Sequence, residues 1–293
     1  MLKELITKYE PATLFTDGEW DHESSVWHST EFLTWLYNES PVKDYIVPND
    51  RWGRETRGRL GGNFTTEYGI IDNGRKIEEV VLDRPFEECR GIGKSFGLNR
   101  IEGVNDYLSA KELIETLCSL VSKGGNFLLN VGPAPDGTIP VIMEERLLQI
   151  GDWLKVNGDA IYATRIYSKE TYDGIYYTQS KDGSRIYAII NRFPFGDITL
   201  PGVPYDPSVN ARLLAHDALV IAVRIADAGI GQSQQAVEMH HAGGIQPPVA
   251  LIIDLAGHLI GVAVQILALA FGNLEVDAAH RVDDLDHAGH VDE

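Results

Sequence analysis

The sequence predicts an α/β fold with parallel buried strands, followed by a smaller antiparallel β domain. Amphipathic helices alternate with short apolar strands through the first half of the chain, which is typical of a parallel sheet with helical crossovers. From residue 171 onward, short strands are separated by Asp-Gly turns, which is typical of antiparallel hairpins. The 293 residues suffice for one large domain or two ordinary domains with a packed core.

The N-terminal part repeats a unit of helix, strand and loop. Residues 2–9 carry apolar side chains at helical spacing, and Pro11 ends that helix before a short apolar strand that leads to Asp17. Residues 29–40 repeat the helical pattern and precede a strand at residues 45–47. Each strand therefore opens into a loop that carries polar residues.

The next segment has a clear helix start. Ser109 and Glu112 form a capping box, and the helix that they open ends at residues 124–125, which are both glycine. Residues 126–131 are almost continuously apolar, as expected of a strand inside a parallel sheet, and residues 141–156 form another helix.

Two tyrosine-rich segments predict the start of the antiparallel domain. Residues 175–178 and 185–190 are separated by an Asp-Gly turn and are expected to pair as a hairpin.

Two acidic residues stand at the ends of predicted strands. Asp17 follows an apolar run, and Glu67 ends a short run rich in threonine and aromatic residues. A retaining glycosidase needs one carboxylate as nucleophile and a second carboxyl group as acid, roughly 5–5.5 Å apart. Asp17 and Glu67 can fill these roles, but Asp17-Gly18 is also a common turn dipeptide, and Glu67 also fits a surface position on an exposed strand.

Arg51 lies between these acids in the sequence, next to Trp52. A guanidinium beside an indole can bind sugar hydroxyls or a carboxylate while the ring packs on an apolar sugar face. The alternative is an ordinary surface salt bridge.

The composition excludes several classes of function. A net charge of -18 argues against a nucleic-acid partner and favours neutral substrates. Cys89 and Cys118 are the only cysteines and lack metal-ligand spacing, so they are expected to be buried thiols, and no metal or other cofactor is indicated.

From about residue 1 to about residue 203, the chain resembles the α-L-fucosidases of glycoside hydrolase family 29. The order and spacing of several motifs carry this resemblance: Asp17-Gly18, Asn49-Asp50-Arg51-Trp52-Gly53, residues 90–97 and residues 122–133.

The resemblance implies a retaining exo-hydrolase that releases terminal L-fucose from glycans or glycosides through a covalent glycosyl-enzyme intermediate. It implies a (β/α)8-like barrel, of the TIM type, followed by a β-sandwich. Asp17 is then the nucleophile and Glu67 the general acid and base. Arg51 is a ligand of the sugar hydroxyls, and Phe96 is the aromatic wall under the methyl face of fucose.

The family's early barrel strands have no counterpart in this chain. We therefore expect a partial barrel at residues 1–165, the start of an incomplete sandwich at 166–205, and an atypical tail at 206–293. A barrel with open edges is expected to aggregate, which predicts a fragment with little or no activity of its own.

The tail differs in composition from the rest of the chain. It contains no Lys, Thr, Trp, Tyr or Cys and most of the histidines, which suggests a non-native reading frame. Residues 248–271 have the length of a membrane span, but Asp254 would cost roughly 2.5–3.5 kcal/mol at its centre, so spurious or soluble apolar structure is the favoured interpretation. The charged N-terminus lacks the apolar core of a secretory signal, so the compartment is not indicated.

Two other classes stay open at this point. The chain can be a non-catalytic carbohydrate-binding or degenerate member of the family. It can also be a gene fragment that never accumulates as folded protein.

Overall fold

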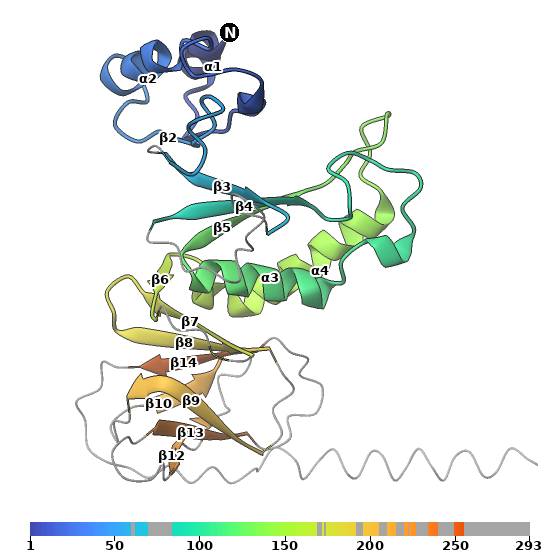
Figure 1. Ribbon diagram of the computed structural model, residues 1–293. Helices are drawn as coiled ribbons and strands as arrows, with labels where there is room; N and C mark the ends of the chain where they lie inside the picture. The colour runs from blue at the N-terminus through green and yellow to red at the C-terminus, as the bar shows by residue number, and fades with distance from the viewer. Residues whose placement is uncertain are drawn as a thin grey trace, which may run out of the picture.

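The computed structural model gives the protein as a mixed α/β fold in which parallel strands and helices precede two antiparallel sheets (Figure 1). The structure describes residues 1–59, 62–69, 84–168, 172, 174–191, 196–204, 210–214, 220–221, 223–226, 234–239 and 249–254.

The N-terminal unit consists of two helices and two short parallel strands. Helix α1 (Leu2–Tyr9) leads to β1 (Thr13–Leu14), and α2 (Ser29–Asn38) leads to β2 (Val47–Pro48), which pairs with β1. These elements confirm the helices expected at the start of the chain. The strand expected at residues 45–47 is present only at Val47, because residues 45 and 46 precede β2. A core of apolar side chains holds the unit together: Ile6, Leu14, Leu36, Val42, Ile46 and Trp52.

Three further parallel strands follow in spatial order β3, β4 and β5. They are β3 (Phe64–Glu67), β4 (Phe86–Gly91) and β5 (Gly125–Asn130). A single parallel bridge between Asn49 and Asn63 connects β2 to the start of β3. The C-terminal ends of β1, β2 and β3 are thereby brought to one edge, although they belong to two sheets.

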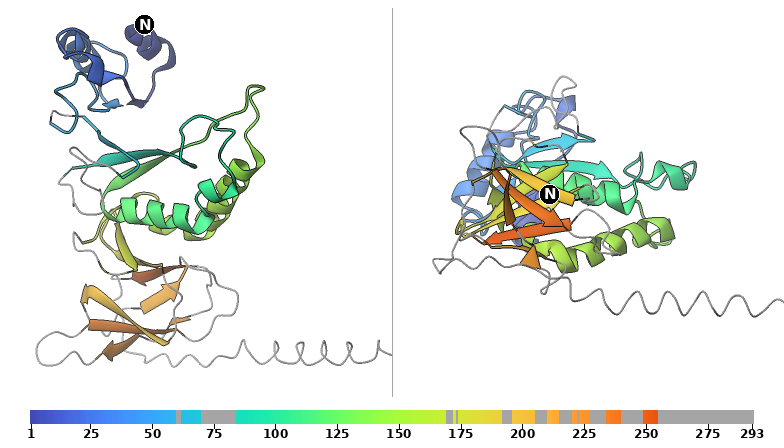
Figure 2. Two further views of the ribbon diagram at one scale, coloured as in Figure 1. Left: turned by 45° about the vertical axis from the view of Figure 1, so that its right-hand side comes forward. Right: turned by 90° about the horizontal axis from the view of Figure 1, so that it is seen from below.

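Two long helices separate the parallel sheet from the antiparallel one (Figures 1 and 2). Helix α3 (Ala110–Ser122) begins at the expected capping box, in which the Ser109 hydroxyl accepts from the Glu112 N–H. Helix α4 is Val141–Asn157. Cys118 of α3 is completely buried against the first antiparallel sheet. Short 3-10 helices are η1 (Glu19–Asp21), η4 (Val104–Asp106) and η5 (Gly158–Ala160).

The expected hairpin is present and forms part of a six-stranded antiparallel sheet. Its strands are β7 (Ile175–Ser180) and β8 (Arg185–Ile190), and β14 (Val249–Asp254) pairs with β8 on the other side. The remaining strands of this sheet are β6 (Thr164–Ile166), β10 (Asn210–Leu213) and β11 (Val220–Ile221). A second sheet contains β9 (Gly196–Pro204), β12 (Val223–Ala226) and β13 (Gln234–Met239).

Five of these strands follow residue 206, where the sequence offered no strand signal. Strand β14 pairs with β8 over six residues, and β13 pairs with β9. The histidines of the tail and residues 255–293 lie outside the described residues. Among the described residues, no helix combines the length and the apolar character that crossing a membrane requires. The domain boundaries and the reading-frame hypothesis stay predictions.

Gly125 provides a test of the packing between β4 and β5. It lies opposite Phe86, and a Cβ at this position would come within 2.6 Å of Phe86 Cε2. The Phe86 ring is completely buried and cannot move aside. We expect Gly125→Ala to lower the free energy of unfolding by about 1–3 kcal/mol in urea titrations.

Gly151, inside α4, is the matched control for this substitution. A Cβ there meets no atom within 4 Å. Gly151→Ala should leave the free energy of unfolding unchanged or raise it by up to about 1 kcal/mol, because alanine is the better helix former. Equal effects of the two substitutions would contradict the described packing.

The two thiols should be unreactive in the folded chain. Cys89 and Cys118 are both buried, as expected from the sequence. Burial raises the pKa of both, that of Cys89 to about 11, with the nearby Glu67 carboxylate adding to the effect. Because a raised pKa keeps the thiol protonated, alkylation at pH 8 should be slow in buffer and fast in urea. Rapid native labelling of Cys89 would show that β4 is not packed as described.

Candidate active site

The candidate site forms where three parallel strands end. Asp17 lies in the loop after β1, Arg51 lies in the loop after β2, and Glu67 is the last residue of β3. Carboxyl ends of parallel strands share one edge, and side chains there can converge although they are distant in the sequence. The structure brings these three residues together as the sequence suggested.

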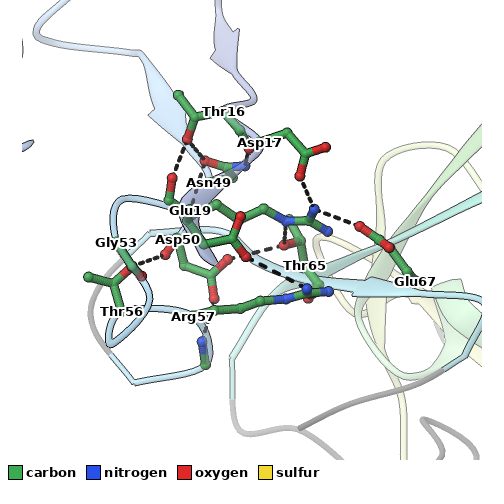
Figure 3. A network of polar contacts seen from close by, with 12 residues as sticks. Thr16, Asp17, Glu19, Asn49, Asp50, Gly53, Thr56, Arg57, Thr65 and Glu67 are labelled. Atoms are coloured by element: carbon green, nitrogen blue, oxygen red, sulfur yellow. Dashed lines mark hydrogen bonds and ion pairs between the residues drawn. The ribbon is translucent and has the colours of Figure 1, made fainter. Parts of the chain in front are cut away.

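The two acids meet on one nitrogen atom. Arg51 Nη1 lies 2.6 Å from Asp17 Oδ1 and 2.6 Å from Glu67 Oε1 (Figure 3). The two carboxylate oxygens are therefore separated by no more than twice that distance. The two acids are therefore close enough for the arrangement of retaining glycosidases, in which the carboxyl groups lie roughly 5–5.5 Å apart.

Hydrogen bonds hold the loops after β1 and β2 against each other. Asn49 Nδ2 donates to the Thr16 carbonyl oxygen at 2.7 Å, and Thr16 Oγ1 lies 2.6 Å from the Arg51 carbonyl oxygen. These bonds involve the residue before Asp17 and the backbone of Arg51. The acid and the guanidinium are thus placed by the backbone as well as by their own ion pair.

A second set of hydrogen bonds orients the guanidinium. Arg51 Nε donates to Thr65 Oγ1 at 2.7 Å, and that hydroxyl lies 3.1 Å from Asp50 Oδ1. Asp50 is completely buried, and its other oxygen accepts from the Gly58 N–H at 2.7 Å. Thr65 of β3 therefore fixes the Arg51 guanidinium at Nε, while the two acids contact Nη1.

The Arg51 guanidinium stays positively charged. The Arg51 side chain has no solvent exposure, whereas Asp17 is 58% exposed and Glu67 is 35% exposed. Burial lowers the pKa of Arg51, but the hydrogen bonds to Glu67 and Asp17 outweigh burial and raise that pKa above its ordinary value. The phenyl ring of Phe15 also packs on the guanidinium, with 4.8 Å between Arg51 Cζ and the ring centroid.

A cavity of about 370 Å³ opens beside this cluster. Asp17 and Arg51 line it together with aromatic side chains, among them Phe15 and Trp27. Glu67 meets the same guanidinium from β3 and is not among the lining residues. Polar groups that converge on one side of an aromatic cavity are typical of a small-molecule site.

Phe96 lies close to the site through Tyr68. The two rings are in edge contact, 5.1 Å between centroids, and Tyr68 directly follows Glu67. Asn130 Nδ2 donates to the Phe96 carbonyl oxygen at 2.5 Å, which connects the loop after β4 to the end of β5. Phe96 is 38% exposed. It makes none of the described contacts with Asp17 or Arg51.

Two further acids belong to this region and were not singled out from the sequence. Glu87 on β4 lies opposite Thr65, so it faces the same side of the sheet as Arg51. Burial raises its pKa, and Arg51 opposes that shift. Glu19 is 5% exposed, with Oε1 lying 3.7 Å from Arg57 Nη1. Single glutamates in short polar segments give no periodic signal, so only the fold identifies them.

The site offers no grouping suited to a metal. Among the described residues, no three His, Cys, Asp or Glu side chains come together as candidate ligands. The chemistry that the described side chains can supply is that of two carboxyl groups around one guanidinium.

Comparisons with known proteins agree with this geometry. The sequence profile of the family described as "Alpha-L-fucosidase" matches residues 1–159. Plasma alpha-L-fucosidase of Rattus norvegicus is 42% identical over 207 residues, which cover 69% of this chain and 44% of the rat protein. Alpha-L-fucosidase of Branchiostoma floridae is 39% identical over 264 residues, 87% of this chain and 56% of that protein.

Solved structures give the same result. A Thermotoga maritima alpha-fucosidase in complex with fucose is 29% identical, with a TM-score of 0.67, and the similarity covers 86% of this chain and 54% of that one. The chain spans about half the length of the relatives that it matches. Since the family profile covers more than half of the sequence and the relatives are about 40% identical over the aligned residues, the chain belongs to the alpha-L-fucosidase family.

Proposed function

We propose that this chain supplies the catalytic carboxyl groups of a retaining α-L-fucosidase that releases terminal L-fucose through a covalent glycosyl-enzyme intermediate. The contact of Asp17 and Glu67 with one nitrogen of Arg51 is the observation that supports this most strongly. Asp17 attacks the anomeric carbon. Glu67 first protonates the leaving oxygen and then activates the water that hydrolyses the intermediate.

The charges of the cluster fit these roles. Two carboxylates around one guanidinium carry a net charge of minus one, so the cluster can hold one proton without leaving Arg51 unpaired. Glu67 is the less solvent-exposed of the two acids. The proposed mechanism requires a protonated Glu67 and an ionised Asp17 when the sugar binds. Once Asp17 is esterified, Arg51 pairs with Glu67 alone. This pairing favours the ionised form of Glu67, which is the form that acts as base.

Arg51 and Phe96 would hold the sugar. Arg51 Nη2 is buried and has no hydrogen-bond partner among the described residues, so it can donate to a sugar hydroxyl. Phe96 is partly exposed and contacts Tyr68, the residue after Glu67, and it can pack under the methyl face of fucose. A neutral deoxy sugar suits this combination of one cation and one apolar ring. The substrate class is therefore a fucosylated glycan or glycoside.

The fold supports a (β/α)8-type architecture. The parallel strands β1, β2, β3, β4 and β5 follow one another in space in the order of the sequence. Helix α2 connects β1 to β2, and α3 connects β4 to β5. We propose that they are the later strands of a TIM-type barrel with the antiparallel sheets as its sandwich domain.

The alternative is a non-catalytic member of the family that binds fucose without turnover. It shares the aromatic rings and Arg51 with the enzyme. The two functions differ in whether Asp17 forms a covalent bond, which is the subject of the first experiment.

Asp17→Gly should abolish hydrolysis of 4-nitrophenyl α-L-fucoside, because it removes the attacking oxygen without altering Arg51. Azide should restore turnover by entering the vacated space, and it should release β-fucosyl azide. Stopped assays with product analysis by nuclear magnetic resonance measure both effects.

Asp21→Gly is the control for this experiment, because Asp21 lies in η1 outside the cluster. This variant should keep the activity of the wild-type protein. Full activity of Asp17→Gly, or a wild-type protein that binds fucose with no turnover, would overturn the enzymatic assignment.

Glu67→Gln should reduce kcat/KM by roughly 10²–10⁴-fold on fucosides with poor leaving groups, because such groups depart only when protonated. The loss should be much smaller on 2,4-dinitrophenyl fucoside, whose leaving group needs no proton. Kinetics on a series of aryl fucosides measure this dependence. Glu87→Gln is the matched control from the same face of the sheet, and a leaving-group dependence in Glu87→Gln alone would transfer the role of acid to Glu87.

A further inference from the structure

Glu88 is a buried carboxylate that the reaction as described does not use. It lies on β4 between Glu87 and Cys89, so its side chain is on the face opposite to Arg51. Only 2% of the residue is exposed. A carboxylate at such a position is costly unless hydrogen bonds compensate its loss of hydration.

Both oxygens of Glu88 bind the end of the neighbouring strand β3. Glu88 Oε1 accepts from the Gly69 N–H at 2.6 Å, and Glu88 Oε2 accepts a short hydrogen bond from the Thr66 hydroxyl. The pKa of Glu88 is raised overall, because burial outweighs the hydrogen bonds from Thr66 and Gly69, which lower it. The two donors bind the carboxyl oxygens in a place where solvent does not.

The two donors lie on either side of Glu67. Thr66 precedes Glu67, and Gly69 follows it by two residues. Glu88 is therefore hydrogen-bonded to the chain both before and after this acid. The chain turns sharply between these two donors, because Tyr68 has a φ of 49°, which is uncommon for a residue with a side chain. Such a conformation needs support from its surroundings.

Tyr68 itself is held by β4. Its N–H donates to the Cys89 carbonyl oxygen at 3.2 Å, and its hydroxyl accepts from the Gly91 N–H at 3.2 Å. Thr66 and Gly69 bind Glu88, which also belongs to β4. The residues on either side of Glu67 are thus hydrogen-bonded to β4. The carboxyl of Glu67 is thereby left as the group that faces Arg51.

We propose that Glu88 is a positioning residue that sets the orientation of Glu67 from the far side of the sheet through Thr66 and Gly69. The proposal rests on the function proposed above, in which Glu67 is the general acid. Its effect on the reaction is to place the acid proton within reach of the leaving oxygen. A misplacement of about 1 Å in a catalytic group can cost on the order of 10²-fold in rate.

Glu88→Met is the variant that tests this role, because it keeps the size of the side chain and removes both acceptors. We expect kcat/KM on a fucosyl disaccharide to fall at least about tenfold more than kcat/KM on 2,4-dinitrophenyl fucoside. Glu88→Gln should behave like wild type, since its amide oxygen can accept from Gly69 and its amide nitrogen can donate to the Thr66 oxygen.

Glu115→Met is the matched control. Glu88 and Glu115 of α3 both line a second cavity, separate from the one beside Asp17. Glu115 accepts a hydrogen bond from the hydroxyl of Tyr176 on β7. Glu115→Met should leave the ratio between the two substrates unchanged. An equal loss on both substrates in Glu88→Met, or no loss on either, would overturn the proposal.

Hydrogen exchange at the Gly69 amide tests the same contact without turnover. Glu88→Met should accelerate exchange at Gly69 relative to Glu115→Met, and unchanged protection would overturn the proposal whatever the activity. Faster exchange in Glu88→Met, together with a wild-type protein that hydrolyses no fucoside, would support the hydrogen bond between Glu88 and Gly69 and refute the enzymatic function instead. If Glu88→Met does not fold, Thr66→Val removes one of the two donors and should give the same substrate dependence with a smaller loss.

Discussion

The shared contact of two carboxylates with the Arg51 guanidinium is the interaction on which the site depends. Strands β1 and β2 form one small sheet and β3 to β5 form another, and a single backbone bridge joins them. Arg51 spans that junction, because it leaves the loop after β2 and reaches Thr65 and Glu67 on β3 as well as Asp17 after β1. The convergence of the acids is therefore a consequence of where one buried side chain is held.

This arrangement favours function over stability. A buried guanidinium loses hydration, and replacing a buried ionic group by a well-packed apolar one is often neutral or stabilising. The polar cluster of Asp50, Thr65 and Arg51 is expensive in these terms, as is Glu88 on the opposite face. Both features are explained if their purpose is to hold acids in fixed orientations. The packing that offsets these costs is provided elsewhere, by the apolar cores under α1 and α2 and between α3 and the antiparallel sheet.

The sequence predicted the elements that have a clear period or cap. Helices α1, α2, α3 and α4, strand β5 and the β7–β8 hairpin all follow from apolar spacing, the Ser109 capping box or Asp-Gly turns. Strand β4 was not predicted, because Glu87, Glu88 and Arg90 interrupt its apolar pattern. Strands β13 and β14 pair with β9 and β8, which are distant in the sequence, and no local pattern encodes such pairings. Asp17, Arg51 and Glu67 were each identifiable as candidates, but their convergence on one nitrogen depends on strand register. Glu88 resembles any surface glutamate until the strand is known to be buried on both faces.

The proposed mechanism requires Asp17 to become covalently bound to the sugar. Incubation of the protein with 2-deoxy-2-fluoro-fucosyl fluoride, followed by proteolysis and mass spectrometry of the peptides, tests this bond, because the fluorine at C2 slows breakdown of the intermediate. We expect a single fluorofucosyl adduct on Asp17. An adduct on another residue, or no adduct in a protein that turns over fucosides, would contradict it.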